Sequence, residues 1–288
     1  MPAVPVKNTP APVLITGCSS GIGLCAARTL GQRGFQVFAS CRREQDVQRL
    51  RDEGLRCLRL DLEDSASIQA ALDELLEETG GRLYGLFNNA GYGQPGAVED
   101  LRREVLRAQF ETNVFGTLEL ISRVIPVMRR QGEGRIIQNS SVLGFVALQY
   151  RGAYNASKYA LEGLYDTLRL ELAGTGIGVS LVEPGPIESR FRANAYEKFL
   201  ANIDAGASVH RDTYTTMVQR LTKPGPAAPF TLPAEAVVTK VLHALESPRP
   251  RPRYYVTFPT YLFGTLKRVL STRMLDRLLL RVSRREQR

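Results

Sequence analysis

The 288-residue chain contains no tryptophan, two histidines and four cysteines. The cysteines all fall in the first fifth of the chain and lack the spacing of metal ligands. We therefore expect no metal site, and we interpret them as reduced packing thiols of a cytoplasmic protein. Their spacing gives no support for a disulfide. These residues are Cys18, Cys25, Cys41 and Cys57.

Long hydrophobic runs are also missing. No apolar stretch is long enough to span a bilayer, and the N-terminus lacks the apolar core of a signal peptide. Four prolines crowd into the first dozen residues, so we expect residues 1–11 to be disordered. The remaining composition is that of an ordinary globular protein. No linker divides residues 12–258, which we interpret as one domain.

Acidic charge is scarce near the end of the sequence. From Arg249 onward eleven basic residues face only Asp276 and Glu286, which accounts for the whole net charge of +9. The balanced body argues against nucleic-acid binding. Within residues 259–288 apolar side chains recur at helical spacing between arginines, so this segment is predicted to be a basic amphipathic helix. Such a helix could lie on an anionic membrane surface, through residues 260–288, or pack on the body or another subunit.

Apolar strands alternate with helical segments along the chain. This order predicts an α/β protein with a single Rossmann-type, doubly wound parallel sheet of about seven strands, helices on both faces and a C-terminal helical extension. Strands are expected at 13–16, 35–40, 56–60, 83–87, 134–140, 178–183 and 253–256. Helices are expected at 22–33, 65–78, 99–130 with a break near Leu101, and 154–172.

A glycine-rich turn follows the first strand and opens the first helix. Without side chains at Gly17, Gly21 and Gly23, a pyrophosphate could approach the backbone and meet the N–H groups of the helix N-terminus. Glycine turns also occur as ordinary loops, but the strand–turn–helix context favours a nucleotide. The predicted contacts in this turn are Gly17, Ser19, Ser20, Gly21, Ile22 and Gly23.

The end of the second strand indicates which nucleotide is preferred. An acidic residue there would bond the ribose hydroxyls of NAD, whereas an arginine accommodates the 2′-phosphate of NADP. The chain has Cys41, Arg42 and Arg43 at this place and no carboxylate. We therefore predict NADP(H) over NAD(H), with Arg42 binding the phosphate and Arg43 in support. The alternative is that both arginines are solvated loop residues.

Tyr154 and Lys158 lie four residues apart, so both side chains project from one face of a helix. An ammonium beside a phenol favours the phenolate, which makes the tyrosine a plausible proton donor. The spacing is common by chance on surface helices. It gains weight from the glycine turn and from the pair Ser140 and Ser141 upstream, and together these predict a hydride-transfer enzyme.

These motifs, in this order over roughly residues 12–190, resemble the short-chain dehydrogenase/reductase family. They are TGxxxGIG from Thr16, Asp61, NNAG from Asn88, Asn113, the serine pair, YxxxK and PGxI from Pro184. The wider sequence is similar to the NADP-dependent aldehyde reductases and to the retinol and hydroxysteroid dehydrogenases of that family.

The resemblance implies a catalytic tetrad of Asn113, Ser141, Tyr154 and Lys158. Ser141 is preferred over Ser140 because the family serine lies thirteen residues before the tyrosine, and Ser140 is expected to be structural. Asn113 would support a water linked to Lys158, although from the sequence alone it could simply bond helix backbone. Lys158 and Tyr154 would also contact the cofactor.

The resemblance further implies where the dinucleotide contacts the chain. Asp61 and Leu62 would bind adenine, although an aspartate here could instead cap a helix, a role better filled by Asp64 or Ser65. The segment after the fourth strand and the turn beneath the nicotinamide supply Asn89, Ala90, Gly91, Pro184, Gly185, Ile187 and Ser189. Ser20 departs from the basic residue of many NADP-dependent relatives, and Ser189 replaces the usual threonine. A homodimer through the two long helices is a family expectation.

Residues 188–235 are expected to close over the substrate with an apolar wall of Phe191, Tyr196, Phe199 and Phe230. This favours a lipophilic aldehyde, ketone or secondary alcohol, without choosing between a fatty aldehyde, a retinoid and a steroid. Two other classes remain open: an NADP(H)-sensing regulator of the same fold and a membrane-associated scaffold protein. The complete tetrad favours the enzyme.

Overall fold

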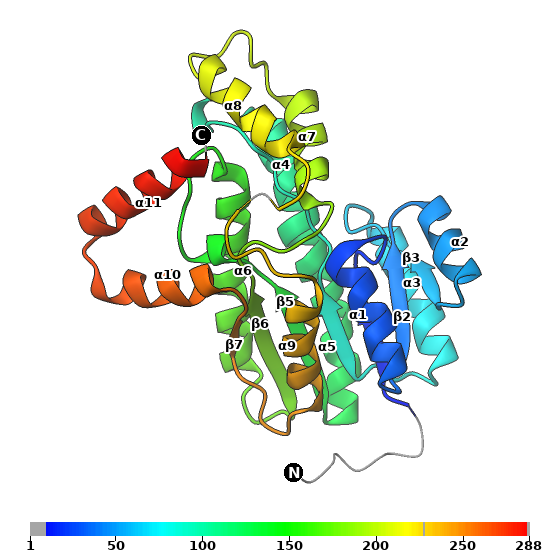
Figure 1. Ribbon diagram of the computed structural model, residues 1–288. Coiled ribbons are helices and arrows are strands. Elements are labelled where there is room, and N and C mark those ends of the chain that lie inside the picture. Colours follow the sequence, from blue (N-terminus) through cyan, green and yellow to red (C-terminus); the bar gives the residue numbers. More distant parts are fainter. Residues whose placement is uncertain (1–9, 227, 287–288) are drawn as a thin grey trace.

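The computed structural model describes residues 10–226 and 228–286 (Figure 1). Most of the segment predicted to be disordered, residues 1–9, lies outside the described residues. Within the described part the prediction is wrong for Ala11, whose carbonyl accepts a hydrogen bond of 3.0 Å from the Gln36 N–H. The chain is therefore joined to the sheet one residue before the first strand begins.

Seven parallel strands form one sheet in the order β3-β2-β1-β4-β5-β6-β7, which confirms the predicted fold class. The strands are β1 (Pro12–Ile15), β2 (Gln36–Cys41), β3 (Cys57–Arg59), β4 (Gly85–Asn88), β5 (Gly134–Asn139), β6 (Ile177–Glu183) and β7 (Arg253–Tyr255). The strand order reverses between β1 and β4. In such sheets ligands bind at this reversal, outside the carboxyl ends of the strands.

Two apolar layers cover the sheet, one on each face. The first packs α3 (Ser65–Glu78), α5 (Gly116–Gln131) and α6 (Gly152–Glu171) against residues such as Leu14. The second packs α1 (Gly21–Gln32), α2 (Glu44–Asp52) and α9 (Glu235–Glu246) against Val13 and Ile15. Alternate residues of β1 therefore enter opposite layers, which explains why the strand is apolar throughout.

The predicted helix at 99–130 is interrupted twice. The expected break is confirmed by a short 3-10 turn, η1 (Val98–Asp100), before α4 (Arg103–Phe110). A π-helical turn, η2 (Glu111–Phe115), then separates α4 from α5 and was not predicted. Helix α2 was also not predicted. Asp64 caps α3 by accepting from the N–H groups of Ala66 and Ser67, as expected.

The segment after β6 forms α7 (Phe191–Asn202) and α8 (Arg211–Thr222), which share a small apolar core beyond one end of the sheet (Figure 1). The predicted terminal helix is two helices, α10 (Phe258–Val269), which lies beside β7, and α11 (Thr272–Glu286). Phe263 of α10 and Leu279 of α11 pack on Val146, in the loop after β5. Within the described ranges, no helix is both long and apolar enough to cross a membrane.

Candidate active site

The turns after β1 and β4 are joined by hydrogen bonds. Thr16 Oγ1 accepts from the N–H groups of Asn89 at 2.9 Å and Ala90 at 3.0 Å. Asn89 Nδ2 donates to the carbonyls of Thr16 and Gly17 at 3.0 and 3.2 Å. The predicted nucleotide residues Asn89 and Ala90 therefore lie directly against the glycine turn.

The glycines of this turn are needed for its close packing. Gly17 has φ +72°, and a Cβ there would lie 2.8 Å from Ala90 Cα. A Cβ on Gly23 would lie 2.2 Å from the Gly17 carbonyl oxygen. Ser20 precedes α1 without making a side-chain capping bond, and the first turn of α1 holds no acidic residue. The first N–H groups of α1 thus lack a side-chain cap, which fits an anionic pyrophosphate.

Tyr154 lies beside both Ser141 and Lys158. Lys158 Nζ donates to the Asn139 carbonyl at 2.7 Å and lies 5.6 Å from the centre of the Tyr154 ring. Burial raises the pKa of Tyr154 to about 12, against the opposing effects of a hydrogen bond with Ser141 and the charge of Arg151. Burial lowers the pKa of Lys158 to about 8, against the charge of Glu162. Exclusion of water thus moves both groups toward their neutral forms.

The two serines after β5 have different surroundings. Ser141 begins the 3-10 turn η3 (Val142–Gly144), and its Oγ accepts from the Leu143 N–H at 3.1 Å while also bonding Tyr154. Ser140 Oγ instead donates to the Glu162 carboxylate of α6. This arrangement agrees with Ser141 facing the tyrosine and Ser140 having a structural role.

Asn113 lies in the π-helical turn and binds outside its own helix. Its Oδ1 accepts from the Tyr92 N–H at 3.2 Å, and its Nδ2 donates to the Tyr92 carbonyl at 3.0 Å and to Ser157 Oγ at 3.1 Å. The alternative of a residue bonding its own helix backbone is therefore wrong. The contact with Ser157 places Asn113 beside the Lys158 turn of α6, and a Cβ on Gly91 would come within 3.1 Å of Asn113 Oδ1.

The two arginines after β2 differ. Arg43 Nε pairs with Asp46 at 2.9 Å, so it is occupied locally rather than available to support a phosphate. Arg42 is exposed, and within the part of the chain that the structure describes its side chain has no hydrogen bond or ion pair. A third arginine, Arg49 of α2, also reaches the glycine turn, and the sequence analysis did not identify it. Its Nη2 donates to the Ser19 carbonyl at 2.8 Å. It would have been found had α2 been predicted.

Asp61 and Leu62 follow β3 at the expected place. Asp61 Oδ1 accepts from the Glu63 N–H at 3.1 Å, and its own N–H donates to Ser67 Oγ at 3.0 Å. Because Asp64 caps α3, Asp61 does not serve as the helix cap. The Leu62 carbonyl packs so closely on Gly116 that a Cβ there would lie 1.9 Å from its oxygen.

The segment after β6 passes back over the glycine turn. The Pro184 carbonyl accepts from the Val142 N–H at 2.8 Å, and a Cβ on Gly185 would lie 2.2 Å from Thr257 Oγ1. Ile187 forms a parallel bridge with Leu232. A Cβ on Gly21 would lie 3.1 Å from Ser189 Cβ. The predicted nicotinamide segment and the predicted pyrophosphate turn are therefore neighbours.

The predicted aromatic wall is largely wrong. Phe191 does lie edge-on to Tyr154, with ring centres 5.2 Å apart. Phe199 is buried against Tyr214 in the core shared by α7 and α8, and Tyr196 packs at the edge of that core. Phe230 packs on Phe258 of α10 instead, at 4.9 Å. Phe199 and Tyr196 are thus used in the packing of α7 against α8.

The family model described as short chain dehydrogenase matches residues 11–199. The chain belongs to the short-chain dehydrogenase family. It is 45% identical over 267 residues, covering 93% of each chain, to the uncharacterized oxidoreductase YbbO of Escherichia coli K12. It is also 34% identical to human 17-beta-hydroxysteroid dehydrogenase type 1, over 85% of this chain and 77% of the human protein.

Solved structures of short-chain dehydrogenases share the fold. A family member from Burkholderia phymatum, solved in complex with NAD, superposes with a TM-score of 0.74 at 27% identity, covering 91% of this chain and 92% of its own. This short-chain dehydrogenase is therefore an oxidoreductase that acts on CH–OH or carbonyl groups and binds a nicotinamide nucleotide.

Proposed function

We propose that this short-chain dehydrogenase uses NADP(H) to reduce the carbonyl of a lipophilic aldehyde or ketone to an alcohol, or to run the reverse oxidation, with Tyr154 as acid or base. The observation that carries the proposal is that Tyr154 bonds the Ser141 hydroxyl and has the Lys158 ammonium 5.6 Å from its ring centre. The uncapped start of α1 supports a dinucleotide beside them.

The chain's own residues manage the proton and the charge, while the nicotinamide supplies the hydride when bound. During reduction the hydroxyls of Ser141 and Tyr154 stabilise the negative charge that grows on the carbonyl oxygen, and Tyr154 donates its proton. The Lys158 ammonium then stabilises the phenolate. Asn113, which bonds the residue before Lys158, supports the route by which the proton is replaced.

The cofactor is held along the carboxyl edge of the sheet. The glycine turn, with Ser19, Ser20 and Ile22, binds the pyrophosphate, and Asp61 with Leu62 binds adenine. Lys158 and Tyr154 hold the nicotinamide ribose. The surrounding contacts come from Asn89, Ala90, Gly91, Pro184, Gly185, Ile187 and Ser189. Arg42 binds the 2′-phosphate, because it is the exposed arginine at the end of β2 without a partner in the described chain.

A lipophilic substrate fits the surroundings of Tyr154. Phe191, which is 38% exposed, presents an aromatic edge to the tyrosine. The likeness to a hydroxysteroid dehydrogenase points the same way. Apolar surface near the reacting atoms would bind an apolar substrate by removing that surface from water.

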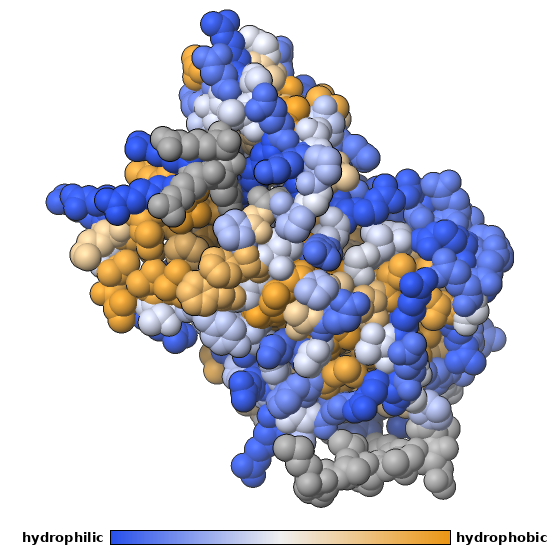
Figure 2. Space-filling view, in the orientation of Figure 1, coloured by the Kyte–Doolittle hydropathy of each residue, from blue (hydrophilic) through white to orange (hydrophobic). Residues whose placement is uncertain are grey.

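We also propose binding partners other than cofactor and substrate for two surfaces of the protein. An apolar groove between α5 and α6 is proposed to bind a second copy of the chain. The outer face of α10 and α11 is proposed to rest on an anionic membrane. Figure 2 shows apolar side chains gathered over these helices next to hydrophilic ones, and several arginines of α11 are exposed.

The experiment is a turnover assay with a panel of aldehydes and ketones of increasing apolar size, with NADPH and NADH run in parallel. We expect NADPH consumption that rises with apolar size, and a loss of about a hundredfold or more in Tyr154→Phe with NADPH binding retained. A variant that turns over near the wild-type rate would contradict the mechanism. NADPH binding without turnover of any carbonyl would instead indicate a nucleotide sensor.

A further inference from the structure

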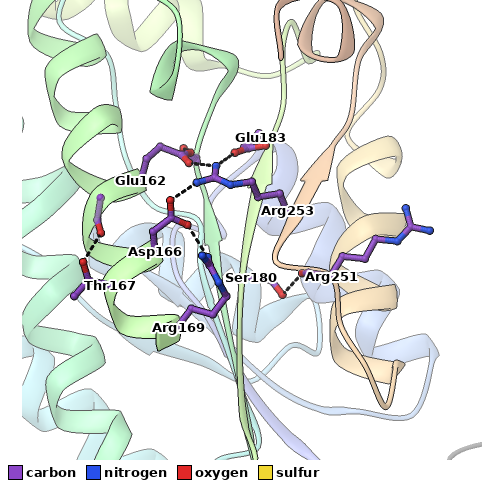
Figure 3. Close-up of polar contacts among 10 residues, drawn as sticks. Glu162, Asp166, Thr167, Arg169, Ser180, Glu183, Arg251 and Arg253 are labelled. Carbon is purple, nitrogen blue, oxygen red and sulfur yellow. Dashed lines mark hydrogen bonds and ion pairs between the residues drawn. The ribbon is translucent and has the colours of Figure 1, made fainter. Parts of the chain in front are cut away.

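Figure 3 shows a cluster of charged side chains around Arg253 of β7. Arg253 of β7 donates from Nη1 to the carboxylates of Glu162 and Glu183, and from Nη2 to Asp166 Oδ2 at 2.6 Å. Asp166 also accepts from Arg169 at 2.6 Å. We call these five residues the Arg253 cluster. It joins α6, the end of β6 and β7 around one guanidinium.

Glu162 connects this cluster to the reaction centre in two ways. It follows Lys158 by one turn of α6, and its charge acts on that ammonium. Its Oε1 also accepts the hydrogen bond from Ser140, the residue before Ser141. The turn η3 packs tightly on this contact, since a Cβ on Gly144 would lie 2.9 Å from Glu162 Oε1.

Of the carboxyl groups on Arg253, that of Glu183 is held toward its neutral form. Burial and the charge of Glu162 raise the pKa of Glu183 to about 8. Glu183 Oε2 has no hydrogen-bond partner among the described residues, and negative charge on an unpartnered buried oxygen is more costly than the neutral form. A negative charge on Glu162, one turn after Lys158 on α6, favours the protonated form of Lys158.

We propose that Glu162 is a positioning residue for the reaction. Through Ser140 it fixes the turn that carries Ser141, and through its charge it keeps Lys158 protonated in a buried site. The proposal rests on the proposed reductase function for its kinetic consequences. The electrostatic part, between Glu162 and Lys158, holds independently of substrate.

The groups that face this pair come from several elements. Lys158 is faced by Tyr154 and Glu162 on α6 and by the Asn139 carbonyl at the end of β5. The groups that face Glu162 are Ser140, Lys158, Asp166, Glu183, Arg253, Tyr255 and Lys267 of α10. Asp166 offers the matched comparison, because it bonds the same arginine one turn farther from Lys158.

The kinetic test compares Glu162→Gln with Asp166→Asn across pH. In wild type the reduction rate should fall as pH rises through about 8, because Lys158 then loses its proton. In Glu162→Gln we expect the rate to begin falling at a pH roughly one unit lower than in wild type. We also expect the plateau kcat to be about tenfold lower, with little change in KM. Asp166→Asn should keep the wild-type profile. Glu162→Asp should restore the position of the fall, since it restores the charge.

A second measurement reads Lys158 without turnover. The side-chain carbons of ¹³C-labelled lysine can be followed by NMR during a pH titration, because the chain has only six lysines. These are Lys7, Lys158, Lys198, Lys223, Lys240 and Lys267. A Lys158→Met variant assigns the resonance. Lys158 should titrate at lower pH in Glu162→Gln than in wild type. In Asp166→Asn it should titrate at the same pH as in wild type.

These measurements separate the possible failures. If Glu162→Gln and Asp166→Asn showed the same Lys158 titration and the same pH profile of the rate, the positioning role of Glu162 would be overturned. Turnover of no carbonyl by wild type would overturn the proposed function, while the titration still decides the role of Glu162. If Glu162→Gln does not fold, Ser140→Ala tests the remaining contact. It should lower kcat without moving the pH profile, and an unchanged kcat would contradict the proposal.

Discussion

At the scale of single residues, the reaction centre depends on groups whose charged forms the fold disfavours. Burial raises the pKa of Tyr154 and lowers that of Lys158, so both are shifted by the same exclusion of water. In reduction this is useful, because Tyr154 keeps its proton until negative charge appears on the substrate. Lys158 then supplies a positive charge that water does not screen.

Arg42 is the residue on which the cofactor preference depends. Arg42→Ala should raise the KM for NADPH about tenfold or more and leave the KM for NADH unchanged, because a charge-assisted phosphate contact is lost. Arg43→Ala is the matched control, since Arg43 already pairs with Asp46. Steady-state kinetics with both nucleotides check this. An Arg42→Ala enzyme with an unaltered KM for NADPH would remove the assignment.

Glu183 gives a prediction about stability and pH. Its pKa is raised from 4.5 to about 8, so the folded state keeps a proton that the unfolded chain has lost. That stabilisation is full below about pH 4.5 and disappears as pH rises through about 8. Glu183→Gln imitates the protonated form permanently. Its melting temperature should therefore rise relative to wild type between these pH values, by several degrees for about 2 kcal/mol.

Asp166→Asn serves as the opposite control for the melting experiment. For Asp166 burial is outweighed by Arg169 and Arg253, which lower its pKa. Its ionised form is thus stabilising at neutral pH, and the variant should lose stability relative to wild type there. A Glu183→Gln difference that stays constant from pH 5 to pH 9 would show that the carboxyl does not hold its proton.

At the scale of elements, the sequence predicted those whose signals are local. The run Val13 to Ile15 is apolar on both faces, and Asp64 is an acceptor placed before α3, so strand and helix were both recognisable. Helix α2 has only two buried residues, Val47 and Leu50, among charged ones. Such a short polar helix gives a weak hydrophobic pattern, and it was missed.

The difference between local and long-range signals also explains which residues of the site could be predicted from the sequence. Tyr154, Lys158 and the glycine turn lie in short motifs, so their chemistry could be inferred from spacing. The π turn around Asn113 has no spacing signature, because its partner Tyr92 lies on another segment. The bond between Arg253 and Glu162 spans 91 residues, and it forms only because β7 pairs with β6 and α6 packs on β6.

The outer face of α10 and α11 is the surface proposed to rest on an anionic membrane. It exposes Val269 and Met274 to 70% and 54%, and within the described residues Arg273 and Arg277 have no ion pair. The double variant Val269→Glu, Met274→Glu should co-sediment several-fold less with phosphatidylserine vesicles. Val209→Glu, at an 85% exposed site between α7 and α8, should bind as wild type. Equal sedimentation of all three proteins would exclude this surface.

At the scale of the whole molecule, the groove between α5 and α6 is the face proposed to bind a second copy. It is lined by apolar side chains of both helices, including Leu118 and Leu164, which are 40% and 37% exposed. Gly163 lies on the same face, and a Cβ there would meet nothing within 4 Å. A smooth apolar face of this kind lets two helix pairs approach closely.

Light scattering after size exclusion can test the dimer. Wild type should give about twice the chain mass of 31.9 kDa, and Leu164→Glu should shift the mass toward that of one chain, because each dimer would bury two uncompensated charges. Leu200→Glu, at a 60% exposed position of α7, should stay dimeric. A wild-type mass equal to one chain would refute the proposal.

The covering of the loop after Ser141 by α11 has a consequence for synthesis. Gln149 N–H bonds Ser283 Oγ at 3.4 Å across a separation of 134 residues, and Val146 is covered by Leu279. At ribosomal rates of about 5–20 residues per second, this loop emerges roughly ten seconds before the helix that shields it. The nascent chain must therefore keep an apolar loop beside its future reaction centre away from other chains during translation.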